Sequence, residues 1–208
     1  MPVEELKEKQ EKIYSIIYPA CTIMDMTIGA ALWFAARGKG ILIDTNEEYT
    51  SQVKIILSGL GADEQLAGYG RHRSAFNHRG YTGLNFELEK DLYRLWKRNL
   101  GRDDRIISDH GREVRFPFLD EQVIKYLHTV PLYTICNLNE PLGFGDKKLL
   151  RQLGKSLGLE NSHKLAKRAI QFGSRVGKVF FPSRSNKIDG TSLFVLQQNN
   201  DNHNITLK

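Results

Sequence analysis

The segment that most constrains the fold is a short apolar run that ends abruptly in glycines. Val53-Lys54-Ile55-Ile56-Leu57 is rich in β-branched residues, Ser58-Gly59-Leu60-Gly61 follows it, and residues 62–67 then have helical propensity. This order predicts a buried strand, a tight turn and the start of a helix. Gly59 and Gly61 allow close backbone approach and positive φ, and successive N–H groups at a helix start can bind an anion or a phosphate.

Two acidic residues, Asp63 and Glu64, come directly after this turn. Adjacent carboxylates could hold Mg²⁺, which prefers oxygen ligands and commonly links a protein to phosphate. In the structural alternative, both carboxylates only favour the positive end of a helix dipole. Spacing alone leaves these two interpretations open.

Helices are expected to dominate the rest of the chain. The apolar spacing predicts helices over 3–17, 26–37, 85–100, 120–130 and 147–157, whereas 41–51, 71–85 and 101–119 are expected to be irregular. Asp25 is the expected N-cap of the second helix and Gly38 its C′ residue, while Asp120 is expected to cap the fourth. The second helix is apolar on all sides, which predicts burial against several elements.

Composition excludes several classes of protein. With 208 residues, 40% of them hydrophobic and 26% charged, the chain is expected to be one globular domain rather than a disordered chain, collagen or a coiled coil. No apolar run approaches the ~20 residues that cross a membrane, and the first residues lack a signal peptide. Cys21 and Cys136 have no metal or redox spacing. These features predict a cytoplasmic protein with free thiols.

Three charged stretches each have two interpretations. Lys and Arg outnumber Asp and Glu by 30 to 24, a net charge of +6, and only 163–187 is clearly one-signed. That stretch indicates either a nucleic-acid surface or, more commonly, a solvated face. The charged residues of 102–105 and 111–120 suit polar ligand recognition or a buried ion-pair network. Lys147 and Arg151, four residues apart, could clamp phosphates or belong to a solvated helix face.

Four motifs, in this order, resemble the synthetase domain of the asparagine synthetase family. Residues 58–64 with Gly68-Tyr69 resemble its Ser-Gly-Glu-Gly-Ala-Asp-Glu…Gly-Gly-Tyr element, and 104–120 match its next signature. Lys147-x-x-x-Arg151 and Lys167-Arg168…Phe172 resemble the two basic motifs that follow. The run Gly-Ala-Asp-Glu-Gln-Leu-Ala-Gly-Tyr-x-Arg-His-Arg at 61–73 is similar to a divergent branch, the asparagine synthetase domain-containing proteins.

The resemblance implies an α/β fold, the helix-rich C-terminal part of a doubly wound ATP-pyrophosphatase domain, related to the adenine nucleotide alpha hydrolases. In that family ATP adenylylates the side-chain carboxylate of aspartate, and ammonia, which complete members take from glutamine, then displaces AMP. By similarity, Ser58, Gly59 and Gly61 would contact the nucleotide, Asp63 would bind Mg²⁺, and Lys147 would be catalytic. The implied cofactors are ATP and Mg²⁺. Neither a membrane nor a nucleic acid is expected as a partner, and a protein partner is left open.

The sequence also departs from the family pattern. Complete members carry an upstream Ser-Gly-Gly-x-Asp-Ser loop and an N-terminal glutaminase domain with a cysteine at position 2, where this chain has Pro2. Leu60 stands where those members have a glutamate, and losing such a preorganised group can cost on the order of 10²–10³ in rate. We therefore expect an N-terminal helix or linker over 1–19, a partial synthetase domain over 20–181 and a polar, disordered tail over 182–208. The expectation for the chain by itself is no asparagine synthesis, and a catalytically inactive nucleotide-binding or interaction module is the alternative.

Overall fold

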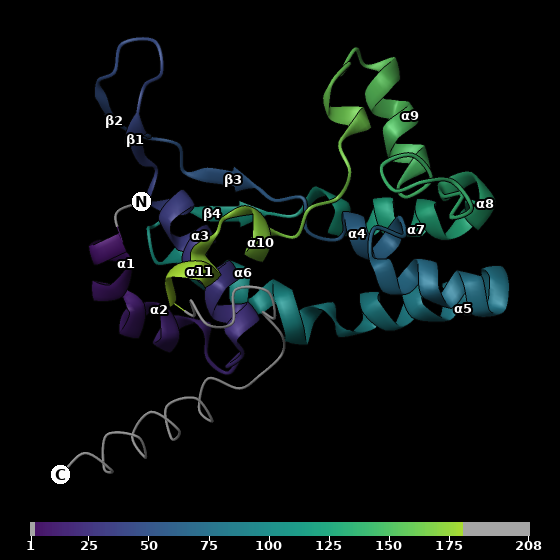
Figure 1. The fold of residues 1–208 in the computed structure, drawn as a ribbon, viewed down its shortest axis with the longest axis horizontal. Helices are drawn as coiled ribbons and strands as arrows, with labels where there is room; N and C mark the ends of the chain where they lie inside the picture. The colour runs from purple at the N-terminus through teal and green to yellow at the C-terminus, as the bar shows by residue number, and fades with distance from the viewer. Residues whose placement is uncertain (1–2, 181–208) are drawn as a thin grey trace. The chain divides into compact units, whose positions relative to one another are not determined.

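The computed structural model describes residues 3–180, which form a helix-rich α/β protein with short strands (Figure 1). The chain divides into two compact units. Unit 1 comprises the residues up to Ile56, Gly101–Val114 and those from Ala169 onward, and unit 2 comprises Leu57–Leu100 and Arg115–Arg168. The polar segment 182–208, for which disorder was expected, lies outside the described residues.

Unit 1 is a helical cluster built around α3. Its helices are α1 (Val3–Glu8), α2 (Gln10–Ile17), α3 (Ile23–Arg37), α6 (Gly101–Ser108), α10 (Ile170–Gly173) and α11 (Val176–Phe180). Helices α2, α6, α10 and α11 all pack against α3, which explains why α3 is apolar on every side (Figure 1). The core consists of buried apolar side chains: Leu6, Ile13, Ile17, Ile23, Met26, Ala30, Trp33, Phe34, Ile106 and Val176.

The ends of α3 confirm one expected cap and correct the other. Gly38 follows the helix with φ 70° and its N–H bonds to Ala35 O, as expected of a C-terminal glycine. The prediction of Asp25 as N-cap is wrong, because Thr22 holds that position and its side chain accepts a hydrogen bond from Asp25 N at 3.0 Å. The helix begins earlier than predicted because Ile23 belongs to the core, so the first turn includes it.

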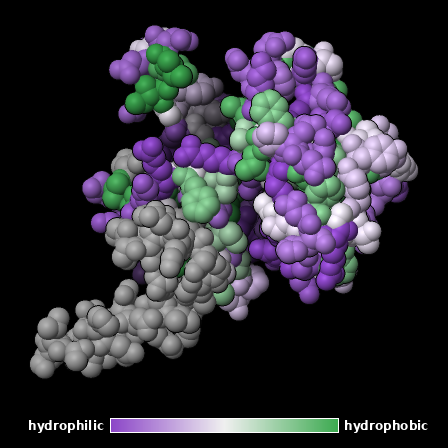
Figure 2. Space-filling view, turned by 45° about the vertical axis from the view of Figure 1, so that its right-hand side comes forward, coloured by the Kyte–Doolittle hydropathy of each residue, from purple (hydrophilic) through white to green (hydrophobic). Residues whose placement is uncertain are grey.

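A hairpin replaces the irregular segment that was expected over 41–51. Strands β1 (Lys39–Ile41) and β2 (Glu48–Thr50) pair antiparallel, with Lys39 opposite Thr50. Every residue of both strands is exposed, so the sequence has none of the alternation that marks a half-buried strand. The apolar residues at the end of β1 are open to solvent, since Ile41 is 64% and Ile43 98% exposed, and Figure 2 shows green atoms among purple ones in this region.

The predicted strand before the glycine turn exists, but its predicted burial is wrong. Strand β3 (Ile55–Leu57) pairs with β4 (Glu113–Arg115), yet Leu57 is 70% exposed and Ile55 is 44% exposed. Within residues 3–180 the two sheets have two strands each. The α/β class is confirmed, and the doubly wound sheet stays a prediction.

Unit 2 contains the helices that carry the motifs. They are α4 (Ala62–Gln65), α5 (Gly70–Leu95), a π-helix (Trp96–Leu100), a 3₁₀ turn (Pro117–Leu119), α7 (Glu121–Thr129), α8 (Leu132–Ile135), α9 (Lys148–Ser156) and a second 3₁₀ turn (Ser162–Lys164). The core side chains are Leu66, Ala67, Leu84, Leu88, Ile135, Cys136 and Leu138.

The structure tests three predictions made from the sequence: the cap at Asp120 and the irregular segments 71–85 and 101–119. Asp120 caps α7 as predicted, since its Oδ1 accepts a hydrogen bond from Gln122 N at 2.8 Å. The prediction that 71–85 is irregular is wrong, because α5 covers it, with a break in helical geometry at Arg79 and Gly80. Residues 101–119 are also more regular than expected, since α6 and β4 lie within them. Cys136 is buried and has a free thiol, as predicted.

Within the described residues, no helix is both long enough and apolar enough to cross a lipid bilayer.

Two arginines of the motif stretch lie buried in unit 1. The guanidinium of Arg102 donates to Asp25 Oδ1 at 2.7 Å and to Asp103 Oδ1 at 2.8 Å. Arg112 donates to the backbone carbonyls of Ser51 and Val53. Of the two interpretations left open for this stretch, the buried ion-pair network describes Arg102, whereas Arg112 is held by backbone carbonyls.

Replacing Arg102 with alanine is expected to lower the free energy of unfolding by about 3–5 kcal/mol, because it leaves two buried carboxylates without their cation. Urea denaturation followed by circular dichroism measures this change. Lys7→Ala, on the exposed surface of α1, is the control and should change stability by less than about 0.5 kcal/mol. Equal effects of the two substitutions would contradict the assigned role of Arg102.

Candidate functional site

The glycine turn in unit 2 is held by hydrogen bonds within the turn and to β4. Ser58 N donates to Arg115 O at 2.9 Å, and Ser58 Oγ accepts from Leu60 N at 3.3 Å. Gly61 has φ 97°, a positive value that glycine allows, and its N–H donates to Glu64 Oε2 at 3.2 Å. The N–H groups of Leu60 and Gly61 are therefore engaged by the protein. The assignment of Ser58, Gly59 and Gly61 to nucleotide binding stays a prediction.

Asp63 lies at the centre of a group of cationic side chains. Lys147 Nζ is 2.9 Å from its Oδ1, and Lys167 Nζ is 3.9 Å from its Oδ2. A Cβ on residue 68 would lie 1.9 Å from Asp63 Oδ1, so Gly68 is needed for the carboxylate to occupy this place. The structure thus brings together two predicted site residues, Asp63 and Lys147, and adds Lys167.

Backbone conformation, in addition to the ion pair with Asp63, fixes the position of Lys147. Lys147 is the N-cap of α9 and has φ 52°, a left-handed conformation that is uncommon for a residue with a side chain. Its N–H donates to Leu66 O at 2.9 Å, directly after α4. This bond places the start of α9 beside the helix that carries Asp63. Nothing in the periodicity of residues 147–157 indicates such a conformation.

The neighbouring carboxylates of Asp63 and Glu64 do not converge. Glu64 is 3% exposed and turns inward, where its Oε1 accepts a hydrogen bond from the Tyr69 hydroxyl at 2.6 Å. Asp63 instead faces the lysines. In the described part of the chain no three His, Cys, Asp or Glu side chains are grouped as a metal site. Of the two carboxylates, only Asp63 is placed to meet a cation.

Tyr69 links the acidic and basic groups of this site. Two cations lie over its ring: the guanidinium carbon of Arg71 is 4.0 Å from the ring centroid, and the Nζ of Lys167 is 4.7 Å from it. Burial and the negative charges of Glu64 and Asp63 raise the pKa of the Tyr69 hydroxyl far above its usual range, so it remains a donor. The resemblance implies no role for Tyr69, although the Gly68-Tyr69 motif contains the residue.

A buried histidine–aspartate pair supports the backbone at Tyr69. His72 Nδ1 accepts a hydrogen bond from Tyr69 N at 3.3 Å, so the ring proton is on Nε2, which donates to Asp91 Oδ2 at 2.8 Å. Arg71 and Arg94 also donate to Asp91. Burial lowers the pKa of His72. Burial alone would raise the pKa of Asp91, but the hydrogen bonds from the two arginines and His72 outweigh it and lower the pKa.

Lys147 and Arg151 do not form a phosphate clamp. Lys147 bonds to Asp63, whereas Arg151 donates to Asp146 Oδ2 at 2.6 Å and to the carbonyl of His163 at 2.8 Å. The two side chains diverge because Lys147 precedes the helix and its backbone is left-handed. Arg151 therefore stabilises the fold of unit 2.

Comparisons with known proteins agree with the motifs. Residues 77–163 match the family model described as asparagine synthase. Asparagine synthetase domain-containing protein 1 of Gallus gallus is 51% identical over 180 residues, which are 85% of this chain and 28% of that protein. The protein of the same name from Homo sapiens is 49% identical over the same share of each chain. This chain belongs to the asparagine synthase family.

The resemblance stated from the motifs is thereby confirmed, and it extends to a protein named as an enzyme. A putative glutamine-hydrolysing asparagine synthetase of Methanocaldococcus jannaschii is 43% identical over 97 residues, 46% of this chain and 18% of that protein. The chain spans less than a third of the length of the relatives described above, 28% in the case of the chicken protein. The asparagine synthase segment includes most of α5 and all of α7, α8 and α9.

Acidification is expected to destabilise unit 2 through His72 and Asp91. The pKa of His72 is below the usual 6.5 in the folded chain, so the unfolded chain binds more protons and stability falls as the pH drops below 6.5. The contribution of Asp91 is present above its usual 3.8 and is lost as the pH falls through its lower folded value. The urea midpoint should therefore decrease between about pH 7.5 and about pH 5.5.

His72→Gln should flatten this dependence between the two pH values. Where that variant is poorly folded, NMR titration of the His72 imidazole in the wild-type chain provides the measurement, and the expected midpoint lies below 6.5. A midpoint above that value would contradict the assigned neutral ring.

Proposed function

We propose that this chain supplies the Asp63–Lys147 part of an ATP-dependent amide ligase of the asparagine synthetase type. In this reaction the side-chain carboxylate of aspartate attacks the α-phosphorus of ATP, an aspartyl adenylate forms and pyrophosphate leaves. Ammonia then attacks the acyl carbon, AMP leaves with the bonding electron pair, and asparagine is released. The observation that carries the proposal is the carboxylate of Asp63 between the ammonium groups of Lys147 and Lys167, at 2.9 and 3.9 Å.

The charges around Asp63 suit a ligand that brings negative charge with it. Two lysines surround one carboxylate, and their side chains are only about a fifth exposed, at 19% for Lys147 and 24% for Lys167. An anion that approaches this place gains from both cations, and fixed cations at a transferring phosphoryl group stabilise the charge that develops there. Lys147 is the catalytic residue of the proposal, because it is the cation nearer to Asp63.

The residues present fit a Mg²⁺ ion that is shared with a substrate. Mg²⁺ is commonly held by one or two carboxylates together with substrate phosphates, and it needs no cage made of protein alone. Asp63 supplies one such carboxylate, partly exposed and already surrounded by cations. Asp63 would hold the ion, and the ion would supply charge neutralisation at the phosphates. The two lysines would then be available to the phosphate oxygens.

Glu64 and Tyr69 have a supporting role in this proposal. Glu64 accepts hydrogen bonds from Gly61 N and from the Tyr69 hydroxyl, so the turn and the start of α5 are joined through one carboxylate. Tyr69 in turn presents its ring to Lys167. Both residues orient the groups that would meet the substrate.

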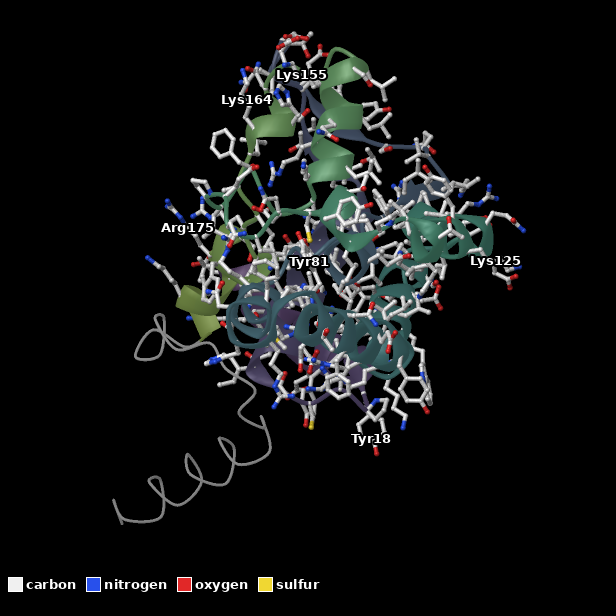
Figure 3. The ribbon with its side chains drawn as sticks, turned by 90° about the vertical axis from the view of Figure 1, so that its right-hand side faces the viewer. Tyr18, Tyr81, Lys125, Lys155, Lys164 and Arg175 are labelled. Atoms are coloured by element: carbon white, nitrogen blue, oxygen red, sulfur yellow. The ribbon has the colours of Figure 1, made fainter. Side chains whose placement is uncertain are left out.

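Isothermal titration of the 208-residue chain with ATP and Mg²⁺ tests the proposal. We expect saturable binding that Lys147→Gln weakens by about 10-fold or more, because hydrogen bonds to charged groups contribute roughly 1.5–3 kcal/mol. Lys125→Gln is the matched control, since this lysine of α7 is exposed (Figure 3) and loses the same charge. It should leave ATP binding unchanged.

Turnover of aspartate, ATP and ammonium to asparagine and AMP is measured on the same samples. Absence of ATP binding by the folded chain, or equal binding by wild type and Lys147→Gln, would overturn the proposal. Binding that depends on Lys147 without any turnover would instead favour the catalytically inactive nucleotide-binding module. Turnover by the wild-type chain would contradict the expectation, drawn from the sequence, that the chain by itself does not make asparagine.

A further inference from the structure

Unit 2 contains a second cluster of cationic side chains, which does not include Asp63 or Lys147. It is a cavity of about 340 Å³ lined by α9, by the segment from Glu140 to Phe144 and by the 3₁₀ turn Ser162–Lys164. In the sequence, His163 and Lys164 open the one-signed basic stretch 163–187, and the proposed function uses only Lys167 of that stretch. In the structure His163 and Lys164 line the same cavity as α9.

One face of α9 supplies most of the charge. Lys148, Arg151 and Lys155 are spaced three, four and seven residues apart, which places them on the same side of a helix. Leu149 and Leu150 lie at other positions of the helix and pack against the core of unit 2. The helix therefore buries an apolar face and presents a basic face to the cavity.

Arg151 fixes the opposite wall of the cavity. Its guanidinium donates to the carbonyls of His163 and Leu165, at 2.8 and 2.9 Å, and its charge is balanced by Asp146. These bonds hold the 3₁₀ turn against α9, so Lys164 remains at the cavity. Lys155 and Lys164 lie at the same end of α9 in Figure 3. The arrangement is thus set by bonds between protein groups.

Three lysines at the cavity have no anionic partner. Among residues 3–180, no carboxylate lies within 4.0 Å of the Nζ atoms of Lys148, Lys155 and Lys164. Glu140 is the one acidic residue of the lining, and its Oε1 accepts a hydrogen bond from Asn137 Nδ2 at 2.7 Å. The surface over α9 is mainly hydrophilic in Figure 2. An anion in the cavity would meet three unneutralised ammonium groups.

We propose that this cavity binds a small molecule that carries at least two phosphate groups. Lys148 and Lys155 are seven residues apart, so their backbones are separated by about 10.5 Å along the helix, more than a single phosphate spans. A chain of phosphates, or a nucleotide with several, can contact both lysines together with Lys164. Phe144 lines the cavity with 60% of its surface exposed and offers an apolar wall to a base or sugar.

The shape of the site favours a small ligand over a nucleic acid. The cavity volume of about 340 Å³ falls within the range of small-molecule sites. Nucleic-acid surfaces instead extend along a groove that follows the backbone over many phosphates. The acidic side chain of Glu140 also lies in the lining, where it would repel a continuous phosphate backbone.

Titration of the 208-residue chain with inorganic tripolyphosphate, in the absence of Mg²⁺, tests the proposal. We expect saturable binding that the triple variant Lys148→Gln/Lys155→Gln/Lys164→Gln weakens by about 10-fold or more. The matched control is Lys7→Gln/Lys39→Gln/Lys54→Gln, three exposed lysines of unit 1, which removes the same charge and should change affinity by less than about 2-fold. Circular dichroism and urea denaturation confirm that both variants are folded.

Both titrations are repeated in the Lys147→Gln background, which separates this cavity from the proposed ATP site. Tripolyphosphate binding at the cavity should persist there and should still depend on the three lysines. Absence of saturable binding, equal losses in both triple variants, or binding that Lys147→Gln removes and the cavity triple leaves intact would each overturn the proposal. Tighter binding of a short oligouridine than of tripolyphosphate, lost in the same triple variant, would show that the occupant is a nucleic acid and the proposal wrong.

Discussion

The hydrogen bond from Lys147 N to Leu66 O is the contact on which the candidate site depends. It joins the end of α4 to the start of α9, two segments that are far apart in the sequence. The left-handed conformation of Lys147 allows its N–H to reach Leu66 while its ammonium group reaches Asp63. Asp63 lies one turn earlier on the same short helix, so backbone and side chain of one lysine hold both ends of α4. Gly68 completes the arrangement by leaving space for the carboxylate.

Several arginines of this chain form hydrogen bonds within the fold, so a positive net charge does not by itself indicate an anionic partner. The guanidinium groups of Arg73, Arg105, Arg112 and Arg151 all donate to backbone carbonyls of distant segments, so much of the positive charge stabilises irregular backbone. Burying carbonyls is costly unless they receive hydrogen bonds, and an arginine offers five donors in a planar fork. The net charge of +6 is therefore a poor guide to partners. The lysines that remain at the α9 cavity are more informative than the total.

Features that depend on neighbouring residues could be predicted from the sequence, and features that depend on distant ones could not. The turn at Gly61, the cap at Asp120 and the end of α3 at Gly38 follow from local chemistry, and the structure has all three. Asp63 and Lys147 were both expected at the site through the resemblance. Their contact joins residues separated by 84 positions, which no spacing rule covers.

Errors in the expected secondary structure have a common cause. The exposed hairpin at Lys39–Thr50 lacks a buried face, and the first part of α5 is basic and contains Arg79-Gly80, so neither shows the hydrophobic periodicity used to find elements. The burial predicted for β3 came from its β-branched composition, which describes a preference for strands rather than the presence of a covering layer. Tertiary contacts determine the structure of these three segments, and the local sequence pattern does not contain information about such contacts.

The two tryptophans of the chain are divided between the units, and their surroundings differ. Trp33 is 4% exposed on α3, where its indole N–H donates to Asp109 at 2.7 Å, whereas Trp96 is 59% exposed in the π-helix after α5. A buried indole emits at shorter wavelength than one in water, and each ring reports only on its own surroundings. Single-tryptophan variants would therefore give separate optical signals for unit 1 and unit 2, so that the unfolding of each could be followed within one intact chain.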